Sequence, residues 1–135
     1  MRSRIHAVVL IALWVASPAY AAQHWGCTPG TTWSGETKPA LWLNISSQST
    51  GSVQIDGRTV ETTYAQTGLN RTWYWGLNDD GIYEYSISLR GDGAALYFDF
   101  AGRSAGSEEE GPPPKFFTCR EFSPKSKREI EGLAN

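Results

Sequence analysis

Between residues 39 and 122 the chain alternates between apolar and polar residues, and this period of two most limits the folds open to it. Successive side chains of a β-strand point to opposite faces, so this pattern predicts strands with one buried face. The clearest example is residues 82–90, where four apolar residues (Tyr83, Tyr85, Ile87 and Leu89) alternate with four polar ones (Glu84, Ser86, Ser88 and Arg90). The chain is therefore expected to be all-β.

About seven strands are expected, at residues 40–46, 52–55, 58–65, 71–77, 82–90, 94–100 and 115–122. Most are separated by short turn sequences such as Asp56-Gly57 and Gly91-Asp92-Gly93, which favour the positive φ of hairpin turns. Tight turns join antiparallel strands, whereas parallel strands need long crossover connections. The favoured fold is an antiparallel meander closed into a small β-barrel, with a two-sheet β-sandwich as the alternative.

The two ends of the chain carry different signals. Residues 1–21 have a basic start, an apolar run at 7–16 and the small-residue end Ala19-Tyr20-Ala21, which is the layout of a secretory signal peptide. Residues 22–38 are rich in Gly and Pro and are expected to form an irregular lead-in to a β-domain at 39–122. Residues 123–135 are expected to form a short C-terminal helix or tail, with Ser123 as its cap and Pro124 in its first turn.

The apolar run of the leader is shorter than the ~20 residues that a membrane-spanning helix needs, and no second apolar run follows. We therefore expect a periplasmic or secreted protein without a membrane span. In an oxidising compartment the two cysteines, Cys27 and Cys119, are expected to form a disulfide. They belong to no Cys-x-x-Cys motif and have no histidine cluster nearby, so neither a redox site nor a metal site is expected.

The charge and the histidines exclude further classes of function. The net charge is −2, whereas nucleic acids and anionic lipids are bound by clustered Lys and Arg, so neither is an expected partner. Beyond the leader the chain has one histidine, His24, which leaves no base for a serine or cysteine nucleophile and no second imidazole for zinc. We expect a non-enzymatic protein with no catalytic residue, no metal and no cofactor.

The aromatic residues suggest a binding surface. The strand pattern gives one face of the sheet to the core residues (Leu41, Leu43, Ile45, Trp73, Trp75, Tyr83, Tyr85, Ile87, Leu89, Leu96, Phe98, Phe100 and Phe117). Four aromatic residues then point the other way: Trp42, Tyr74, Tyr97 and Phe116. Large exposed apolar patches are rare on soluble monomers, and Trp and Tyr dominate binding hot spots. Our hypothesis is that these four residues bind a protein or glycan partner, the alternative being that the terminal helix or the lead-in covers them.

A second candidate site lies inside the expected barrel. Trp73, Trp75, Tyr83 and Tyr85 are large and carry polar tips, so they are candidates to line a pocket for a small apolar ligand, as in lipocalin-like carriers. The same side chains are also large enough simply to fill a narrow core.

Two short motifs resemble a known family. Trp25-Gly26-Cys27 near the start and Phe117-Thr118-Cys119 near the end resemble small periplasmic lysozyme inhibitors of the membrane-bound C-type group. The resemblance implies an exported β-barrel that inhibits an enzyme. The Ser-Gly-x-x-Tyr loop that those inhibitors insert into the lysozyme cleft is not in this chain, so it transfers no inhibitory residue.

Overall fold

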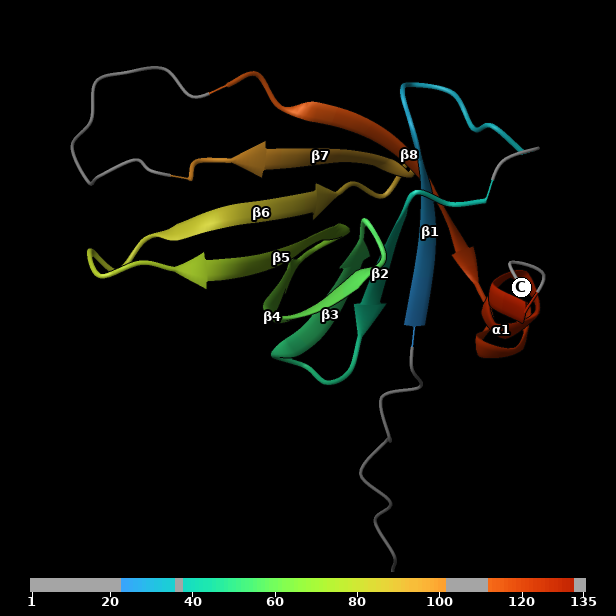
Figure 1. Cartoon of the computed structure of the whole chain (residues 1–135), viewed down its shortest axis with the longest axis horizontal. Coiled ribbons are helices and arrows are strands. Elements are labelled where there is room, and N and C mark those ends of the chain that lie inside the picture. The colour runs from blue at the N-terminus through green and yellow to red at the C-terminus, as the bar shows by residue number, and fades with distance from the viewer. Residues whose placement is uncertain (1–22, 36–37, 102–111, 133–135) are drawn as a thin grey trace, which may run out of the picture.

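The fold is that of a computed structural model, which describes residues 23–35, 38–101 and 112–132 (Figure 1). The predicted signal peptide and the acidic run Glu108–Glu110 lie outside these residues. The described part comprises eight strands followed by one helix: β1 (Gln23–Pro29), β2 (Leu41–Ile45), β3 (Thr50–Ile55), β4 (Arg58–Thr67), β5 (Asn70–Leu77), β6 (Tyr83–Leu89), β7 (Ala94–Asp99), β8 (Lys115–Phe122) and α1 (Pro124–Gly132).

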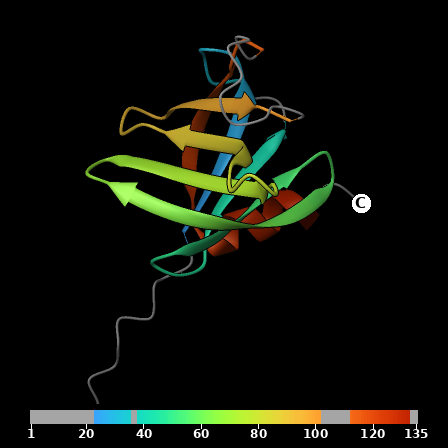
Figure 2. The same ribbon diagram turned by 90° about the vertical axis from the view of Figure 1, so that its left-hand side faces the viewer.

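The strands form a closed antiparallel barrel in which each strand pairs with its neighbours in sequence and β1 pairs with β8. The predicted all-β meander barrel is therefore confirmed, and the sandwich alternative is not what forms. Figure 2 shows the same strands from the end at which the β5–β6 turn lies in Figure 1. α1 has nine residues, and the described part of the chain holds no helix of the length and apolarity that a membrane crossing needs.

The interior of the barrel is filled with large side chains. Trp73 of β5 is fully buried and contacts Trp25 and Tyr64, with ring centroids 6.0 and 5.2 Å away. Its indole Nε1 donates a 2.9 Å hydrogen bond to the Asn44 carbonyl oxygen on β2. Gly51 makes room for this contact, because a Cβ there would overlap that oxygen and come within 2.8 Å of Nε1. Aliphatic residues of the facing strands, Leu41, Leu43, Ile45, Val53, Ile87 and Leu89, complete the core.

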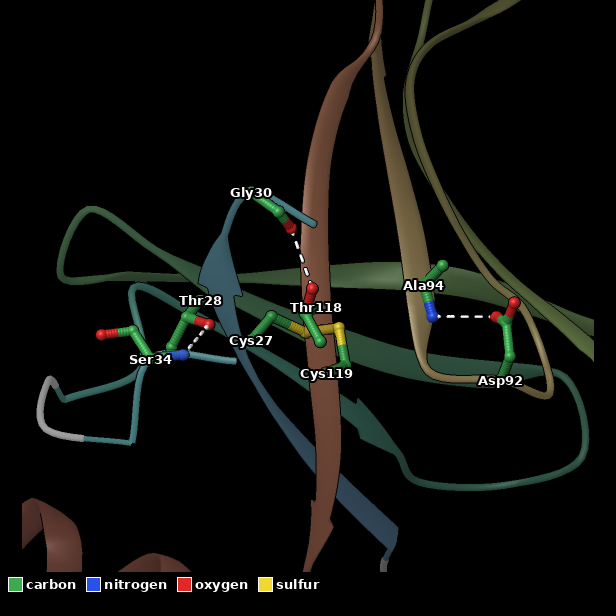
Figure 3. Close-up of a disulfide and its surroundings, with 8 residues drawn as sticks. All are labelled: Cys27, Thr28, Gly30, Ser34, Asp92, Ala94, Thr118 and Cys119. Atoms are coloured by element: carbon green, nitrogen blue, oxygen red, sulfur yellow. Dashed lines mark hydrogen bonds between the residues drawn. A yellow bond between two sulfur atoms is a disulfide. The ribbon is translucent and has the colours of Figure 1, made fainter. Parts of the chain in front are cut away.

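The disulfide joins the first and last strands of the barrel. Cys27 of β1 lies opposite Cys119 of β8, and their sulfurs are bonded as predicted (Figure 3). Two hydrogen bonds support this seam: Thr118 Oγ1 donates to the Gly30 carbonyl at 2.9 Å, and the Ser34 amide donates to Thr28 Oγ1 at 3.3 Å. The first and last strands are thus tied together where the barrel closes.

The structure corrects three sequence-based predictions. Residues 23–29 form strand β1 where an irregular lead-in was expected, because Trp25 and Cys27 alternate with polar or small residues and face the core. On β7 the inward residues are Ala95 and Tyr97, which pair with Leu89 and Ile87, so Leu96 and Phe98 lie on the outer face. Tyr83, also expected in the core, is 36% exposed.

The terminal helix forms as predicted and covers one of the outward aromatic residues. The Ser126 amide donates to Ser123 Oγ at 3.1 Å, which caps α1, and Pro124 is its first residue. Trp42 is only 5% exposed because Phe122 packs on it edge-on at 5.2 Å and the Lys127 ammonium lies 5.4 Å from its ring. The C-terminal segment therefore packs on Trp42.

Candidate functional site

The four aromatic residues predicted to form one binding surface are not brought together. Trp42 is covered, and Tyr97 points inward and packs against the core. Phe116 is 55% exposed on β8, but two strands, β6 and β7, lie between it and Tyr74 on β5. Of the four, Tyr74 is half-buried and lies beside the exposed Tyr83, with ring centroids 5.6 Å apart.

The four residues predicted for an internal pocket are also divided. Trp73 is part of the packed core, and Tyr83 lies outside with Tyr74. Trp75 and Tyr85 remain together: their rings stack at 5.5 Å with an interplanar angle of 15°. Both are half-buried near one end of the barrel.

A groove opens between β4 and β5 where these strands stop pairing. Their ladder runs from Thr67 opposite Asn70 to Thr63 opposite Tyr74 and ends there. Beyond that point residues 58–62 of β4 pair only with β3, while Trp75 and Leu77 pair with β6. The resulting gap has a volume of about 340 Å³ and is lined by Glu61, Thr62, Thr63, Tyr74, Trp75, Gly76, Leu77 and Tyr83. We call it the β4–β5 groove.

One wall of the β4–β5 groove is apolar and exposed. Leu77 is 61% exposed and lies opposite Tyr83 near the tip of the β5–β6 hairpin. This hairpin ends on the side of the molecule away from α1 (Figure 1). The hydroxyl of Tyr83 on β6 lies 3.3 Å from Thr63 Oγ1 on β4, within hydrogen-bond distance. Its ring also packs on Tyr74 of β5, so Tyr83 contacts both strands that border the groove.

The other side of the groove is polar. Thr62 is 7% exposed, and its Oγ1 is buried without a hydrogen-bond partner among the described residues. An unsatisfied buried hydroxyl is costly, and a ligand in the groove could hydrogen-bond to it after a side-chain shift in the groove lining. Glu61 beside it is exposed. The groove thus offers apolar contact area and a carboxylate within one opening, with a buried hydroxyl in its lining.

Gly76 marks the point at which β5 departs from regular strand geometry. Its φ is 72°, which extended residues do not adopt, and it turns the backbone between Trp75 and Leu77. A Cβ at this position would lie 2.8 Å from the Tyr85 ring. The signal was present in the sequence, since a lone Gly within a strand pattern marks a local irregularity or a close approach. Strict alternation along residues 82–90 predicts Tyr83 inside the barrel, and alternation does not mark Glu61, Thr62 and Thr63, which line the groove because the β4–β5 ladder ends beside them.

A second aromatic cluster lies on the inner side of the same end of the barrel. Tyr97 packs 6.0 Å from Trp75, and the Lys115 ammonium lies 5.9 Å from the Tyr97 ring. Burial raises the pKa of the Tyr97 hydroxyl above its ordinary value, and the nearby groups Asp99, Tyr85 and Asp56 raise it further.

This raised pKa predicts a loss of stability at alkaline pH. The folded chain keeps the Tyr97 proton more tightly than the unfolded chain does, so stability is unaffected at neutral pH and falls as pH rises past about 10. Urea unfolding midpoints measured from neutral to alkaline pH should fall less steeply for Tyr97→Phe than for the wild type. Equal slopes for the two proteins would show that Tyr97 does not contribute.

The described residues give little support for a metal site, for a role of His24, or for an anion site at the Trp25 end of the barrel. No group of three or more His, Cys, Asp and Glu residues is placed to hold a metal ion there. His24 is held on the outer face of β1 by a 2.6 Å hydrogen bond between its Nδ1 and Asn44 Oδ1. A hollow of about 300 Å³ at the Trp25 end of the barrel has the Arg71 guanidinium over the Trp25 ring, but it also contains the carboxylates Asp92 and Glu121.

If the β4–β5 groove is a binding surface, its aromatic side chains contribute little to folding. Replacing Tyr74 and Tyr83 with Ser removes one half-buried and one exposed ring, with an expected loss of about 1 kcal/mol each. The measurement is the free energy of unfolding in urea. A loss for either variant as large as that of a core substitution would mean that these rings are structural.

The chain matches no protein-family model, no curated protein and no solved structure.

Proposed function

We propose that the protein is an exported, non-catalytic binding domain that takes a protein or glycan partner at the β4–β5 groove. The observation that carries the proposal is the combination found there: the exposed side chains of Leu77 and Tyr83 beside the buried, unpartnered hydroxyl of Thr62. Exposed apolar side chains and an unsatisfied polar group both cost free energy or solubility in the isolated protein. A partner that covers the groove would bury the apolar side chains, and a side-chain shift in the lining would let it pair with the hydroxyl.

The surrounding structure supports a surface site over transport of a ligand inside the barrel. Trp25, Tyr64 and Trp73 fill the middle of the interior, and Trp73 is held by a hydrogen bond to the opposite wall. A carrier would have to displace these rings. The groove, by contrast, is open without any rearrangement of the barrel.

The disulfide supports the exported location in this proposal. Such bonds persist in the periplasm and outside cells, and they are rare where thiols are kept reduced. The Cys27–Cys119 bond lies in the barrel seam. Expression with the leader intact, followed by sequencing of the N-terminus of the exported product, tests this location.

Binding is tested by comparing three forms of the immobilised protein. These are the wild type, the groove variant Tyr74→Ser/Tyr83→Ser, and a control variant, Leu69→Ser/Phe116→Ser, which removes exposed apolar side chains elsewhere on the barrel. Each form is offered a glycan array and an extract of proteins from the cell envelope of the source. We expect the wild type and the control to retain a common partner that the groove variant releases. Retention by all three forms, or loss by the control as well, would contradict the groove as the binding site.

A further inference from the structure

We infer that the β4–β5 groove binds an extended, basic peptide segment of a partner protein, by strand addition between β4 and β5. This inference rests on the proposed function and names the class of its partner. It follows from three observations on the groove: unpaired strand edges, an excess of carboxylates, and exposed aromatic faces.

The strand edges give the peptide a place for its backbone. Past Thr63 and Tyr74, β4 and β5 each keep a strand partner on one side only within the described residues, so the two edges that face the gap are unpaired. Gly76, on the β5 side of this gap, is exposed. An unpaired edge is a template for a further strand, and many domains bind extended peptides in this way. A segment that enters the gap can pair its backbone with either of these edges.

One carboxylate lines the opening and three others lie near it in the chain or in space. Glu61 lines the groove, and Glu84 lies at its edge, with its Cβ 3.6 Å from the Cβ position of Gly76. Asp79 and Asp80 are exposed in the turn that joins β5 to β6, between Leu77 and Tyr83. None of the salt bridges between described residues involves these four carboxylates. Arg58 lies at the far end of the unpaired β4 edge, but no Lys or Arg is among the groove residues. This imbalance favours a cationic segment over a neutral glycan or an acidic peptide.

The aromatic rings fit the same kind of segment. The rings of Tyr74 and Tyr83 pack 5.6 Å apart with planes inclined by 38°, and both line the groove together with Glu61. An Arg or Lys side chain can place its alkyl stem on such rings and its charge over a ring face or against a carboxylate. Alternate residues of an inserted strand point to the same side, so we expect basic residues at every second position of the segment.

A selection from a random peptide library displayed on phage tests this inference directly. Peptides enriched on the wild type should be basic at alternate positions and should not be enriched on the Tyr74→Ser/Tyr83→Ser variant. A synthetic version of the best peptide should bind Glu61→Gln/Glu84→Gln about tenfold more weakly at low salt, and the control Glu121→Gln/Glu129→Gln with unchanged affinity. Methylation of alternate backbone amides of the peptide should abolish binding, because it removes the donors of the added strand.

Several results would overturn the inference. Enriched peptides that are neutral or acidic would contradict the charge argument. Binding that survives methylation of the odd-numbered amides, and also survives methylation of the even-numbered amides, would contradict strand addition. If no peptide depends on the groove while the groove variant still releases a glycan, the partner class is wrong and the proposed function stands. Light scattering that shows a dimer of the wild type, lost in the groove variant, would instead make a second copy of the chain the occupant.

Discussion

Replacing Trp73 with Ala is expected to lower the free energy of unfolding by about 3–5 kcal/mol, the range for large aromatic residues in well-packed cores. Trp73 is fully buried, contacts the rings of Trp25 and Tyr64, and satisfies the Asn44 carbonyl oxygen. The substitution removes all three contributions and leaves a cavity in the middle of the barrel. Urea unfolding followed by circular dichroism measures the loss.

A second variant separates packing from hydrogen bonding at this position. Trp73→Phe keeps much of the apolar volume but leaves the Asn44 carbonyl without the indole donor, at an expected cost of about 1–3 kcal/mol. If Trp73→Ala unfolds at nearly the same urea concentration as the wild type, the barrel interior is not packed around this residue, and an internal ligand site regains its support.

Removing the disulfide is expected to have the second large effect. The bond closes a loop with a sequence separation of 92 residues. In the chain-entropy model a loop of this length contributes about 4–5 kcal/mol by restricting the unfolded chain. A typical domain has a stability of about 5–15 kcal/mol, so Cys27→Ser/Cys119→Ser should unfold at a much lower urea concentration or fail to fold at 37 °C.

The reduced wild type provides the control for this variant. Reduction without sequence change should give the same loss as the double substitution, since both release the same constraint. A loss below about 1 kcal/mol in both would mean that the β1–β8 ladder and the hydrogen bond from Thr118 to Gly30 hold the seam without the bond.

The sequence was sufficient to predict the fold because its signals are local. Alternation on β2, β5 and β6, and the turn at Asp56-Gly57, specify strands and their order, and an antiparallel meander then needs no long-range information. Ser123 and Pro124 likewise mark the start of α1. Strand β1 was missed because Gly and Pro around it suggest irregular structure, while its pairing with β8 is set by residues far away in the chain.

The candidate site was less predictable because it depends on where strands stop pairing. Alternation assigns faces only within a regular ladder, and the β4–β5 ladder ends at Tyr74. On β7 the small residue Ala95 occupies the inner position beside Phe117, so counting large residues assigned the wrong face to that strand. The cover over Trp42 comes from Phe122 and α1, whose docking position no local pattern specifies.

Amide chemical shifts of the isotope-labelled protein test the β4–β5 groove most directly. The protein is titrated with a peptide selected for binding to it, and two-dimensional NMR spectra are recorded. The binding proposal predicts that the largest changes occur at residues 61–63, 74–77 and 83–84, and that the indole signal of the buried Trp73 moves little. Changes centred on the Trp73 indole, or on β1, β8 and α1 with the groove signals unmoved, would contradict it.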